Sequence, residues 1–421
     1  MKVGIIGSGG REHALCYSLR KSQKIKKIYC IPGNAGTSEI ATNVNLEIEN
    51  FEKLKNFIKE KKIELVIIGP EKPLSEGIVD YLEKNQIKVF GPNKIASQLE
   101  SSKIFTKNLC KNYKIPTANF KIVNDKNEAY QFLNNCRYPL VVKADGLAAG
   151  KGVYICDDKN QSIKAVDEIF DGKFGKAEKL LIEEFLKGEE MSFFIIYDGE
   201  NYKTFGTAQD HKRVFEGDKG MNTGGMGAYS PSRLENKELE KKILQKIIEP
   251  TLKGLKELKT KFKGFLYAGL MVIENEPFLI EYNVRMGDPE CQTILPKLKT
   301  DFAEILIAVL NKKLNAINIE WDNYKSLCVV LCSKGYPKKY INEIEIKNLE
   351  KFDLSENQFI FHAGTKKENN KIISNGGRVL NFVTKSQNFK VSRDQALNLI
   401  KKLNWSNGYY RKDIGYKVIN K

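Results

Sequence analysis

Short apolar runs alternate with helical patterns through the first hundred residues, and this alternation constrains the fold more than any other feature of the chain. The apolar runs lie at residues 3–6, 28–31, 65–68 and 89–90, and the helical patterns at residues 12–21, 51–61 and 78–84. Strands that alternate with helices form a parallel sheet with helices on both faces. The sequence therefore predicts an N-terminal doubly wound parallel sheet, whose ligands bind at the carboxyl ends of its strands.

Polar turns rich in glycine or proline follow three of these strands. They contain Gly9, Gly10, Arg11 and His13 after the first strand, Asn34 and Gly36 after the second, and Pro70 and Glu71 after the third. Because the three turns meet at one edge of the predicted sheet, they indicate a small-molecule site. The alternative for each turn is chain reversal alone.

The first of these turns opens a helix, and backbone N–H groups at a helix N-terminus bind phosphate. Glu12 stands where a dinucleotide-binding motif has its third glycine, and the second strand ends in Ile-Pro-Gly-Asn, without an acidic residue. Both departures disfavour a nicotinamide or flavin cofactor. A phosphate monoester bound beside Arg11 and His13 fits the turn better.

A second glycine-rich loop lies between predicted strands at residues 140–143 and 153–156. The loop contains Gly146, Gly150, Lys151 and Gly152, and Lys143 ends the strand before it. Glycines and lysines in this arrangement are typical of a flap that closes over a triphosphate. The loop is not a Walker motif, because a glycine follows Lys151 and the chain continues into a strand.

Two oxygen-bearing side chains lie two residues apart near the end of a later strand. Glu281 and Asn283 would project from the same face, and carboxylate and amide oxygens are ligands that Mg²⁺ accepts. Arg285 would continue this face toward phosphates or an anionic substrate. The alternative is a polar strand face in solvent, which the Gly-Asp-Pro turn that follows makes less favourable.

Composition narrows the classes of partner. The 421 residues are 41% hydrophobic, and 69 Lys and Arg against 52 Asp and Glu leave 17 excess positive charges. Such a balance is compatible with nucleic acid, an anionic membrane surface or phosphorylated small molecules. No apolar stretch approaches the roughly 18 residues that span a bilayer, and the start lacks a signal-peptide pattern. Glutamates interrupt the lysine-rich stretches, which favours solvated helix faces over a surface for nucleic acid. Together, these features predict a soluble cytoplasmic protein that binds neither nucleic acid nor membrane.

Many long strings of the sequence, in this order, resemble the phosphoribosylamine–glycine ligase family of ATP-grasp enzymes. The strings are GSGGREHA, PGNAGT, GPEKPL, VKADGLAAGKGV, EEFLKGEEMSF, QDHKRV, NTGGMGAYSP, GFLYAGLM, EYNVRMGDPE, FHAGT, NGGRVL and YRKDIGY. The resemblance covers essentially the whole chain. It implies a multidomain α/β and α+β protein. Residues 1–103 would bind phosphoribosylamine, residues 104–324 would form the ATP-grasp domain with a lid at about 121–189, and residues 325–421 would form a C-terminal α+β domain.

The family pattern also assigns roles to residues of this chain. Lys103, Lys143 and the loop 146–152 would contact the phosphates of ATP, Glu183 and Leu186 the adenine, and Glu190 the ribose. Glu281 and Asn283 would hold the metal. Asp210, Lys212, Arg285 and Asp288 would be catalytic, and Arg213, Asn222, Gly224 and Gly225 would bind substrate together with the N-terminal turns.

The reaction implied by the resemblance joins glycine to 5-phosphoribosylamine, with ATP as co-substrate, Mg²⁺ or Mn²⁺ as cofactor and glycyl phosphate as intermediate. The resemblance also allows a monomer or weak dimer and a transient contact with the upstream amidophosphoribosyltransferase. Two departures are Met286, where the family usually has Leu or Phe, and Leu270, where many ATP-grasp enzymes have a further metal-binding carboxylate. The remaining alternatives are another ATP-grasp ligase or carboxylase acting on a purine precursor, and a basic nucleic-acid-binding protein.

Overall fold

The computed structural model describes residues 1–147 and 152–419. Its N-terminal part is a parallel sheet in the order β3-β2-β1-β4-β5. The strands are β1 (Lys2–Gly7), β2 (Lys27–Pro32), β3 (Thr42–Asn43), β4 (Leu65–Ile68) and β5 (Val89–Pro92). The helices are α1 (Gly10–Arg20), α2 (Thr37–Ile40), α3 (Phe51–Lys61), α4 (Glu71–Glu76), α5 (Ile78–Lys84) and α6 (Gln98–Ser101). The predicted doubly wound sheet is confirmed.

Apolar side chains from alternating strand positions explain why helices cover both faces of this sheet. Val3 and Ile5 pack in one core with Leu15 of α1, whereas Ile6 packs in another with Leu54 of α3. The carboxyl ends of β1, β2 and β4 lead into the three polar turns, which therefore lie on one edge, as the sequence predicted.

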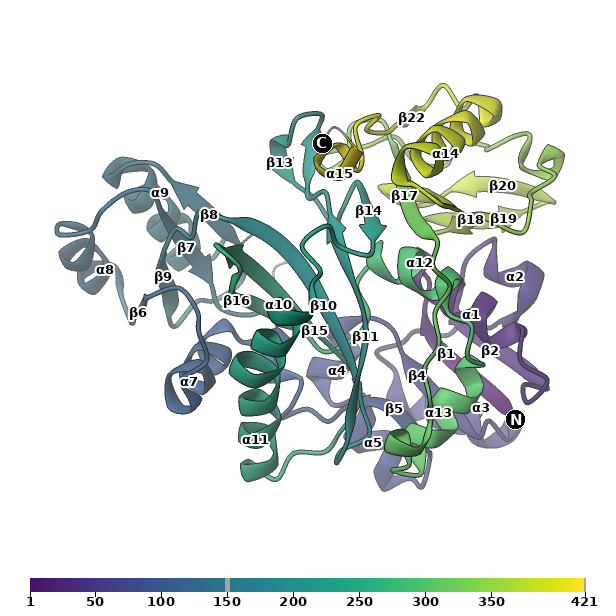
Figure 1. Cartoon of the computed structure of the whole chain (residues 1–421), viewed down its shortest axis with the longest axis horizontal. Helices are drawn as coiled ribbons and strands as arrows, with labels where there is room; N and C mark the ends of the chain where they lie inside the picture. Colours follow the sequence, from purple (N-terminus) through teal and green to yellow (C-terminus); the bar gives the residue numbers. More distant parts are fainter. Residues whose placement is uncertain (148–151, 420–421) are drawn as a thin grey trace.

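A separate four-stranded antiparallel sheet lies within residues 120–184, close to the range expected for the lid. This sheet, which is called the lid below, projects from the body at the upper left of Figure 1. Its order is β6-β9-β7-β8. The elements are α7 (Lys103–Tyr113), which precedes it, β6 (Phe120–Val123), α8 (Lys126–Leu133), β7 (Leu140–Ala144), β8 (Val153–Cys156), α9 (Lys159–Phe170) and β9 (Leu180–Glu184). The lid has an apolar core of its own.

Long antiparallel strands join the N-terminal sheet to the rest of the body, because β5 pairs with the first residues of β15. These elements are β10 (Glu189–Tyr197), β11 (Tyr202–Asp210), β12 (Arg213–Phe215), β13 (Lys219–Asn222), β14 (Gly227–Ser230), β15 (Phe262–Ile273) and β16 (Glu276–Asn283). The helices are α10 (Lys237–Ile243), a π turn (Leu244–Ile248), α11 (Glu249–Glu257), α12 (Glu290–Ile294) and α13 (Phe302–Leu310), with short 3₁₀ turns at Leu295–Lys297 and Leu314–Ala316.

The C-terminal part extends the same sheet through β14, β17, β21 and β18, so that one sheet of 14 strands runs through the body. Its elements are β17 (Lys325–Ser333), a 3₁₀ turn (Leu349–Lys351), β18 (Gln358–His362), β19 (Thr365–Glu368), β20 (Lys371–Ser374), β21 (Arg378–Ser386), α14 (Phe389–Leu403), β22 (Gly408–Tyr409) and α15 (Tyr416–Ile419). No helix in residues 1–147 and 152–419 has the length and apolar character needed to cross a membrane.

Candidate active site

A cavity of about 1180 Å³ lies where the N-terminal sheet edge, the lid, the central strands and the C-terminal part meet. Nineteen of the site residues predicted from the sequence line it. They are Gly9, Arg11, Pro70, Glu71, Lys103, Lys143, Gly146, Glu183, Leu186, Glu190, Asp210, Lys212, Arg213, Asn222, Gly224, Glu281, Asn283, Arg285 and Asp288. Gly10, His13, Asn34, Gly36, Gly152 and Gly225 are not among its lining residues. Gly150 and Lys151 lie outside the described residues.

The predicted metal-binding pair lies on β16, with both residues on the cavity wall. Tyr282, between them, points to the opposite face and is buried in the core. Desolvation opposes the charge on Glu281, but Lys212, Lys143, Lys103 and Arg285 lower the pKa of its carboxyl. Glu281 is therefore ionised at neutral pH and offers a hard oxygen ligand.

These two residues fit a divalent cation that takes its remaining ligands from phosphates and water. Within the described parts of the chain, no group of three or more His, Cys, Asp and Glu residues is arranged to hold a metal. Leu270 is fully buried in the core beside Leu279, so this position supplies no further carboxylate.

Lys212 stands at the centre of an acidic part of the cavity. Its Nζ lies 3.1 Å from Oε2 of Glu190 and 3.8 Å from Oε1 of Glu281. Desolvation disfavours the ammonium form, but Glu190, Asp210 and Glu281 outweigh it and raise the pKa of Lys212. The lysine is therefore positively charged, and it faces both the predicted ribose ligand and the predicted metal ligand.

Asp210 faces the same space from the end of β11. Desolvation and the nearby carboxylates of Glu290, Glu190 and Glu281 raise the pKa of Asp210 to about 7, although Lys212 acts in the opposite direction. A carboxyl group with this pKa changes its charge near neutral pH. Perturbed groups of this kind are typical of functional sites.

Glu290 is a cavity residue to which the sequence analysis gave no role. It is the first residue of α12 and is 3% exposed. The hydroxyl of Tyr267 donates a hydrogen bond of 3.0 Å to its Oε1. An acidic residue directly after the Gly-Asp-Pro turn was the only local signal for this position.

On the side of the cavity predicted to bind adenosine, one predicted ligand is held in a cluster of ion pairs. Glu183 is buried, and its carboxylate lies 2.8 Å from Nζ of Lys143 and 3.1 Å from Nζ of Lys107. Its side chain is therefore engaged with two lysines, and a contact to adenine would require its main chain. Lys107 is a second buried lysine on this wall that the sequence analysis missed. Lys103 donates a hydrogen bond of 3.0 Å to the carbonyl oxygen of Gly146, at the start of the predicted flap.

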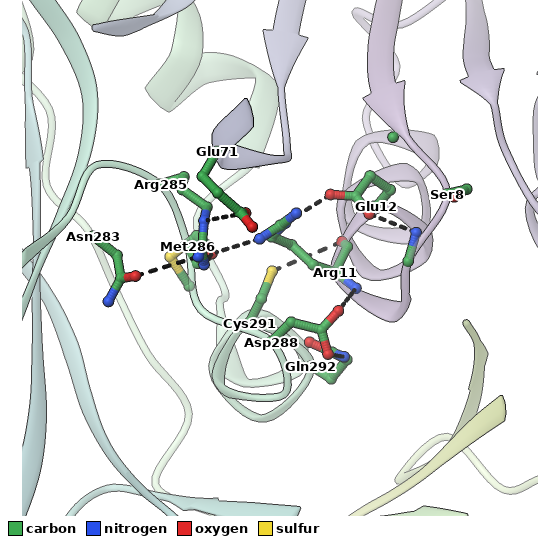
Figure 2. A network of polar contacts seen from close by, with 12 residues as sticks. Ser8, Arg11, Glu12, Glu71, Asn283, Arg285, Met286, Asp288, Cys291 and Gln292 are labelled. Carbon is green, nitrogen blue, oxygen red and sulfur yellow. Dashed lines mark hydrogen bonds and ion pairs between the residues drawn. The ribbon is translucent and has the colours of Figure 1, made fainter. Parts of the chain in front are cut away.

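Figure 2 shows how the first glycine turn meets the loop after β16. The guanidinium of Arg11 donates to Oε1 of Glu12 at 2.6 Å and to the carbonyl oxygen of Met286 at 3.2 Å. Arg285 donates to the same carbonyl at 3.0 Å. It also pairs with Glu100 at 2.6 Å and with Glu71 at 3.3 Å. Two arginines that line the cavity and come from distant parts of the chain therefore converge on one carbonyl group.

The phosphate cradle predicted for the first turn is only partly open. The N–H of Gly9 donates to Oε2 of Glu12 at 2.6 Å, and the N–H of Arg11 donates to Oδ2 of Asp288 at 3.2 Å. Carboxylates at a helix N-terminus are favoured by the helix dipole, so the protein satisfies these donors itself. A Cβ on Gly10 would collide with the side-chain amide of Asn381, so Gly10 serves close packing.

His13, Asn34 and Gly36 join the N-terminal turns to β18. The N–H of His362 donates to Nδ1 of His13 at 2.9 Å, and desolvation, helped by His362, lowers the pKa of His13. The amide of Asn34 donates to the carbonyl oxygens of Ser8 and His362, both at 2.8 Å. These residues hold the first turn against the C-terminal part, and the direct substrate contact expected of them stays a prediction.

The C-terminal part also supplies a cavity residue that the sequence analysis missed. Arg378 donates hydrogen bonds to the carbonyl oxygens of Gly224 at 2.6 Å and Asp288 at 2.7 Å, and it pairs with the Asp288 carboxylate at 3.2 Å. No local pattern brings residue 378 beside residue 224. Arg378 ties the turn after β13 to the loop after β16.

Comparisons with known proteins match this chain to one family over nearly its whole length. Three models of phosphoribosylglycinamide synthetase match it, the N domain over residues 1–100, the ATP-grasp (A) domain over 101–291 and the C domain over 326–417. The phosphoribosylamine–glycine ligase of Caldanaerobacter subterraneus subsp. tengcongensis is 45% identical over 98% of this chain and 99% of its own.

Solved structures are similar over nearly the same length. The crystal structure of phosphoribosylamine–glycine ligase from Thermotoga maritima matches with a TM-score of 0.84 at 33% identity, covering 99% of this chain and 100% of that one. The biotin carboxylase domain of Hydrogenobacter thermophilus 2-oxoglutarate carboxylase, solved with MgADP, ADP and bicarbonate, matches with a TM-score of 0.72 over 95% of this chain and 89% of that one. At 18% identity, the second likeness shows a shared fold alone.

Proposed function

The chain belongs to the phosphoribosylglycinamide synthetase family and is an ATP-dependent ligase that joins glycine to 5-phosphoribosylamine in purine biosynthesis, and we propose that the reaction passes through glycyl phosphate in the cavity described above. One observation supports this proposal most. One cavity is lined by the N-terminal turns, by the predicted metal ligands and by charged groups of opposite sign. The metal ligands are Glu281 and Asn283, the cation is Lys212, and Asp210 and Glu290 form an acidic wall.

Activation of glycine is needed because a carboxylate is a poor electrophile. In the proposed first step, a carboxylate oxygen of glycine attacks the γ-phosphorus of ATP, the bond to the β-phosphate oxygen breaks, and ADP leaves. A divalent cation held by Glu281 and Asn283 would supply charge neutralisation at the phosphoryl group. Lys103 and Lys143 would hold the phosphates in line, and Lys212 would attract the transferring group.

The acidic wall suits the other end of glycine. Its ammonium group can donate hydrogen bonds to the carboxylates of Asp210 and Glu290, which leaves its carboxylate directed toward Lys212. Tyr267 holds Glu290 through its hydroxyl, so the acceptor is fixed before glycine arrives. Opposite charges at the two ends of the subsite would orient the substrate for the first step.

The second step takes place toward the N-terminal turns. The amine of 5-phosphoribosylamine attacks the acyl carbon, the bond to phosphate oxygen breaks, and the amine loses a proton as phosphate leaves. Gly9, Pro70 and Glu71 would line the sugar, and Arg285 would face the departing phosphate. Enclosure of the cavity would keep water from the acyl phosphate.

The test measures ADP formation with glycine and freshly generated 5-phosphoribosylamine, omitting each substrate in turn. Glycine labelled with ¹⁸O in its carboxylate distinguishes the intermediate, because one labelled oxygen should appear in the inorganic phosphate. Absence of ADP with all three substrates contradicts the assignment to this reaction. Unlabelled phosphate with full turnover contradicts glycyl phosphate alone.

The proposal also covers the metal cofactor, the cellular location, the oligomeric state and a partner of the enzyme. The cofactor would be Mg²⁺ or Mn²⁺, the location the cytoplasm, and the assembly a monomer or weak dimer. A transient contact with the upstream amidophosphoribosyltransferase would deliver the amine. Sedimentation at several protein concentrations tests the assembly, and the rate with each metal in turn tests the cofactor.

A further inference from the structure

Residues 409–417, near the end of the described chain, form a segment that we call the strap. The sequence analysis gave them no place beyond the C-terminal domain, yet Arg411 is 0% exposed. Its guanidinium donates to Asp413 at 2.8 and 2.7 Å, to Oδ1 of Asp218 at 2.8 Å, and to the carbonyl oxygen of Arg213 at 3.0 Å. A buried arginine with this many charged partners fixes the geometry of what it contacts.

The partners of Arg411 outside the strap belong to the hairpin formed by β12 and β13. The carboxylate of Asp413 accepts from the N–H of Gly217 at 2.8 Å, and the hydroxyl of Tyr416 donates to Asp218 at 2.9 Å. Lys417 pairs with the same aspartate at 3.1 Å. In Figure 1, α15 at the end of the strap lies beside β13 at the top of the molecule.

The hairpin depends on such support because it forms a two-stranded sheet of its own, with no pairing to the large sheet. Isolated hairpins of two strands are marginally stable in water. Its base nonetheless carries Lys212, Arg213 and Asn222, which line the cavity. Contacts made from the far end of the chain therefore support the position of these side chains.

The strap also determines the state of a buried histidine next to Lys212. The backbone N–H of Gly415 donates to Nε2 of His211 at 3.1 Å. A backbone N–H can only donate, so Nε2 is the acceptor and a neutral ring carries its proton on Nδ1. Desolvation and the charge of Arg411 lower the pKa of His211 to about 4, so the ring is neutral at pH 7.

We propose that residues 409–417 act as a positioning strap for the ligase reaction, with Arg411 as the positioning residue that keeps the β12–β13 hairpin, and with it Lys212, in place for glycine activation. This inference deepens the proposed function, since it takes Lys212 as the group that serves glycine and the transferring phosphoryl group. In the proposed function, the phosphates of the nucleotide are held by two other lysines that line the cavity, Lys103 and Lys143. Loosening the strap should therefore impair glycine use while leaving ATP binding intact.

The kinetic test compares Arg411→Met with the conservative Arg411→Lys. For Arg411→Met we expect kcat/KM for glycine to fall about tenfold or more, since hydrogen bonds to charged groups are lost, with the Kd for ATP within about twofold. Arg411→Lys keeps the charge next to Asp218 and should recover part of this loss. Equal losses in glycine use and ATP binding, or wild-type kinetics in folded Arg411→Met, would overturn the proposal.

A spectroscopic readout does not depend on turnover. The chain has only three histidines, so ¹⁵N-labelled imidazoles can be assigned one by one. His211 should show the Nδ1–H tautomer in the wild type and lose it in Arg411→Met, whereas His13, whose Nδ1 accepts a hydrogen bond, should show the Nε2–H tautomer in both. An unchanged His211 tautomer in Arg411→Met contradicts the strap. This readout holds even if the wild type forms no ADP with glycine, an outcome that would contradict the proposed function instead.

Asp218→Asn provides a second variant if Arg411→Met does not fold. Asp218 is partly exposed and lies on the hairpin, where it forms ion pairs with Arg411 and Lys417 and accepts a hydrogen bond from Tyr416. The variant leaves the ion pair between Arg411 and Asp413 in place. We expect a fall of roughly three- to tenfold in kcat/KM for glycine, with the Kd for ATP preserved. Wild-type glycine kinetics in this variant would refute the role of the strap.

Discussion

The carboxylate of Glu183, shared by two buried lysines, leads to a prediction about the lid. Glu183 on β9 lies 3.1 Å from Lys107 on α7 and 2.8 Å from Lys143 on β7, and all three side chains are at most 8% exposed. Glu183→Gln keeps the size of the side chain but removes the only negative charge in this group. Breaking a buried ion pair by removing one partner costs about 3–5 kcal/mol, because the remaining charge is left without compensation.

Native-state hydrogen exchange of the β7 and β9 amides measures this cost locally, because it reports the free energy of opening of the lid sheet. We expect that free energy to fall by about 3–5 kcal/mol in Glu183→Gln. The loss should shrink as the pH rises. Without Glu183, desolvation lowers the pKa of Lys107 further, and a lysine with a lowered folded-state pKa becomes less destabilising once it is neutral.

A double-mutant cycle with Lys107→Met provides the control. The double variant contains one buried cation in place of two, so it should lose less than the sum of the single losses, by about 1–3 kcal/mol. Additive losses within about 0.5 kcal/mol would refute the coupling. A loss below about 1 kcal/mol in Glu183→Gln would mean that the pair behaves as a surface salt bridge.

Three further predictions concern charge in the cavity and the core. Glu281→Gln should lower kcat for ADP formation roughly 100-fold or more, with a smaller change in the Kd for ATP, because one oxygen ligand loses its charge at the phosphoryl group; titration with Mg²⁺ checks this. Asp210 has a raised pKa of about 7, so the KM for glycine should rise as the pH falls below 7, and Asp210→Asn should show a high KM without this pH dependence. Burial lowers the pKa of Lys297 from 10.5 to about 8, so between pH 8 and pH 10.5 the unfolded state binds more protons than the folded state. The free energy of unfolding, measured in urea, should therefore rise by about 3 kcal/mol across this pH range. Lys297→Met should not show this rise.

Local periodicity was sufficient to predict much of the N-terminal sheet. The elements expected at residues 51–61, 65–68 and 78–84 have the same bounds in the structure, because each buries one apolar stripe or run. The helical stretch from Lys237 to Glu257 contains a π turn at Leu244–Ile248, which local periodicity does not predict. The pairing of β5 with β15 joins residues about 170 positions apart, Pro92 with Phe262, and no local pattern encodes it.

The candidate site also combines residues that a local pattern predicts with residues whose contacts are distant in sequence. Strand periodicity was enough to place Glu281 and Asn283 on one face, since residues two apart share a face. Arg378 and the strap around Arg411 were missed because their partners are distant in sequence. The phosphate site at the first turn stays a prediction, but the sequence did not show that Asp288, 277 residues from Arg11, accepts a hydrogen bond from one of the N–H groups of this turn.

The lining of the cavity contains more acidic than basic side chains, although the chain as a whole is basic. Among the described residues, ten Lys and Arg side chains line the cavity against thirteen Asp and Glu, although the whole chain carries 17 excess positive charges. Lys143, Lys212 and Arg285 are each paired with carboxylates, so a phosphate must replace those partners rather than meet free cations. A divalent cation that enters with ATP offsets the repulsion from the surplus carboxylates, and the lysines can then exchange a carboxylate for a phosphate oxygen. The surplus of positive charge lies on other surfaces, so raising the ionic strength should affect nucleotide affinity through this exchange in the cavity and only weakly through the net charge of the protein.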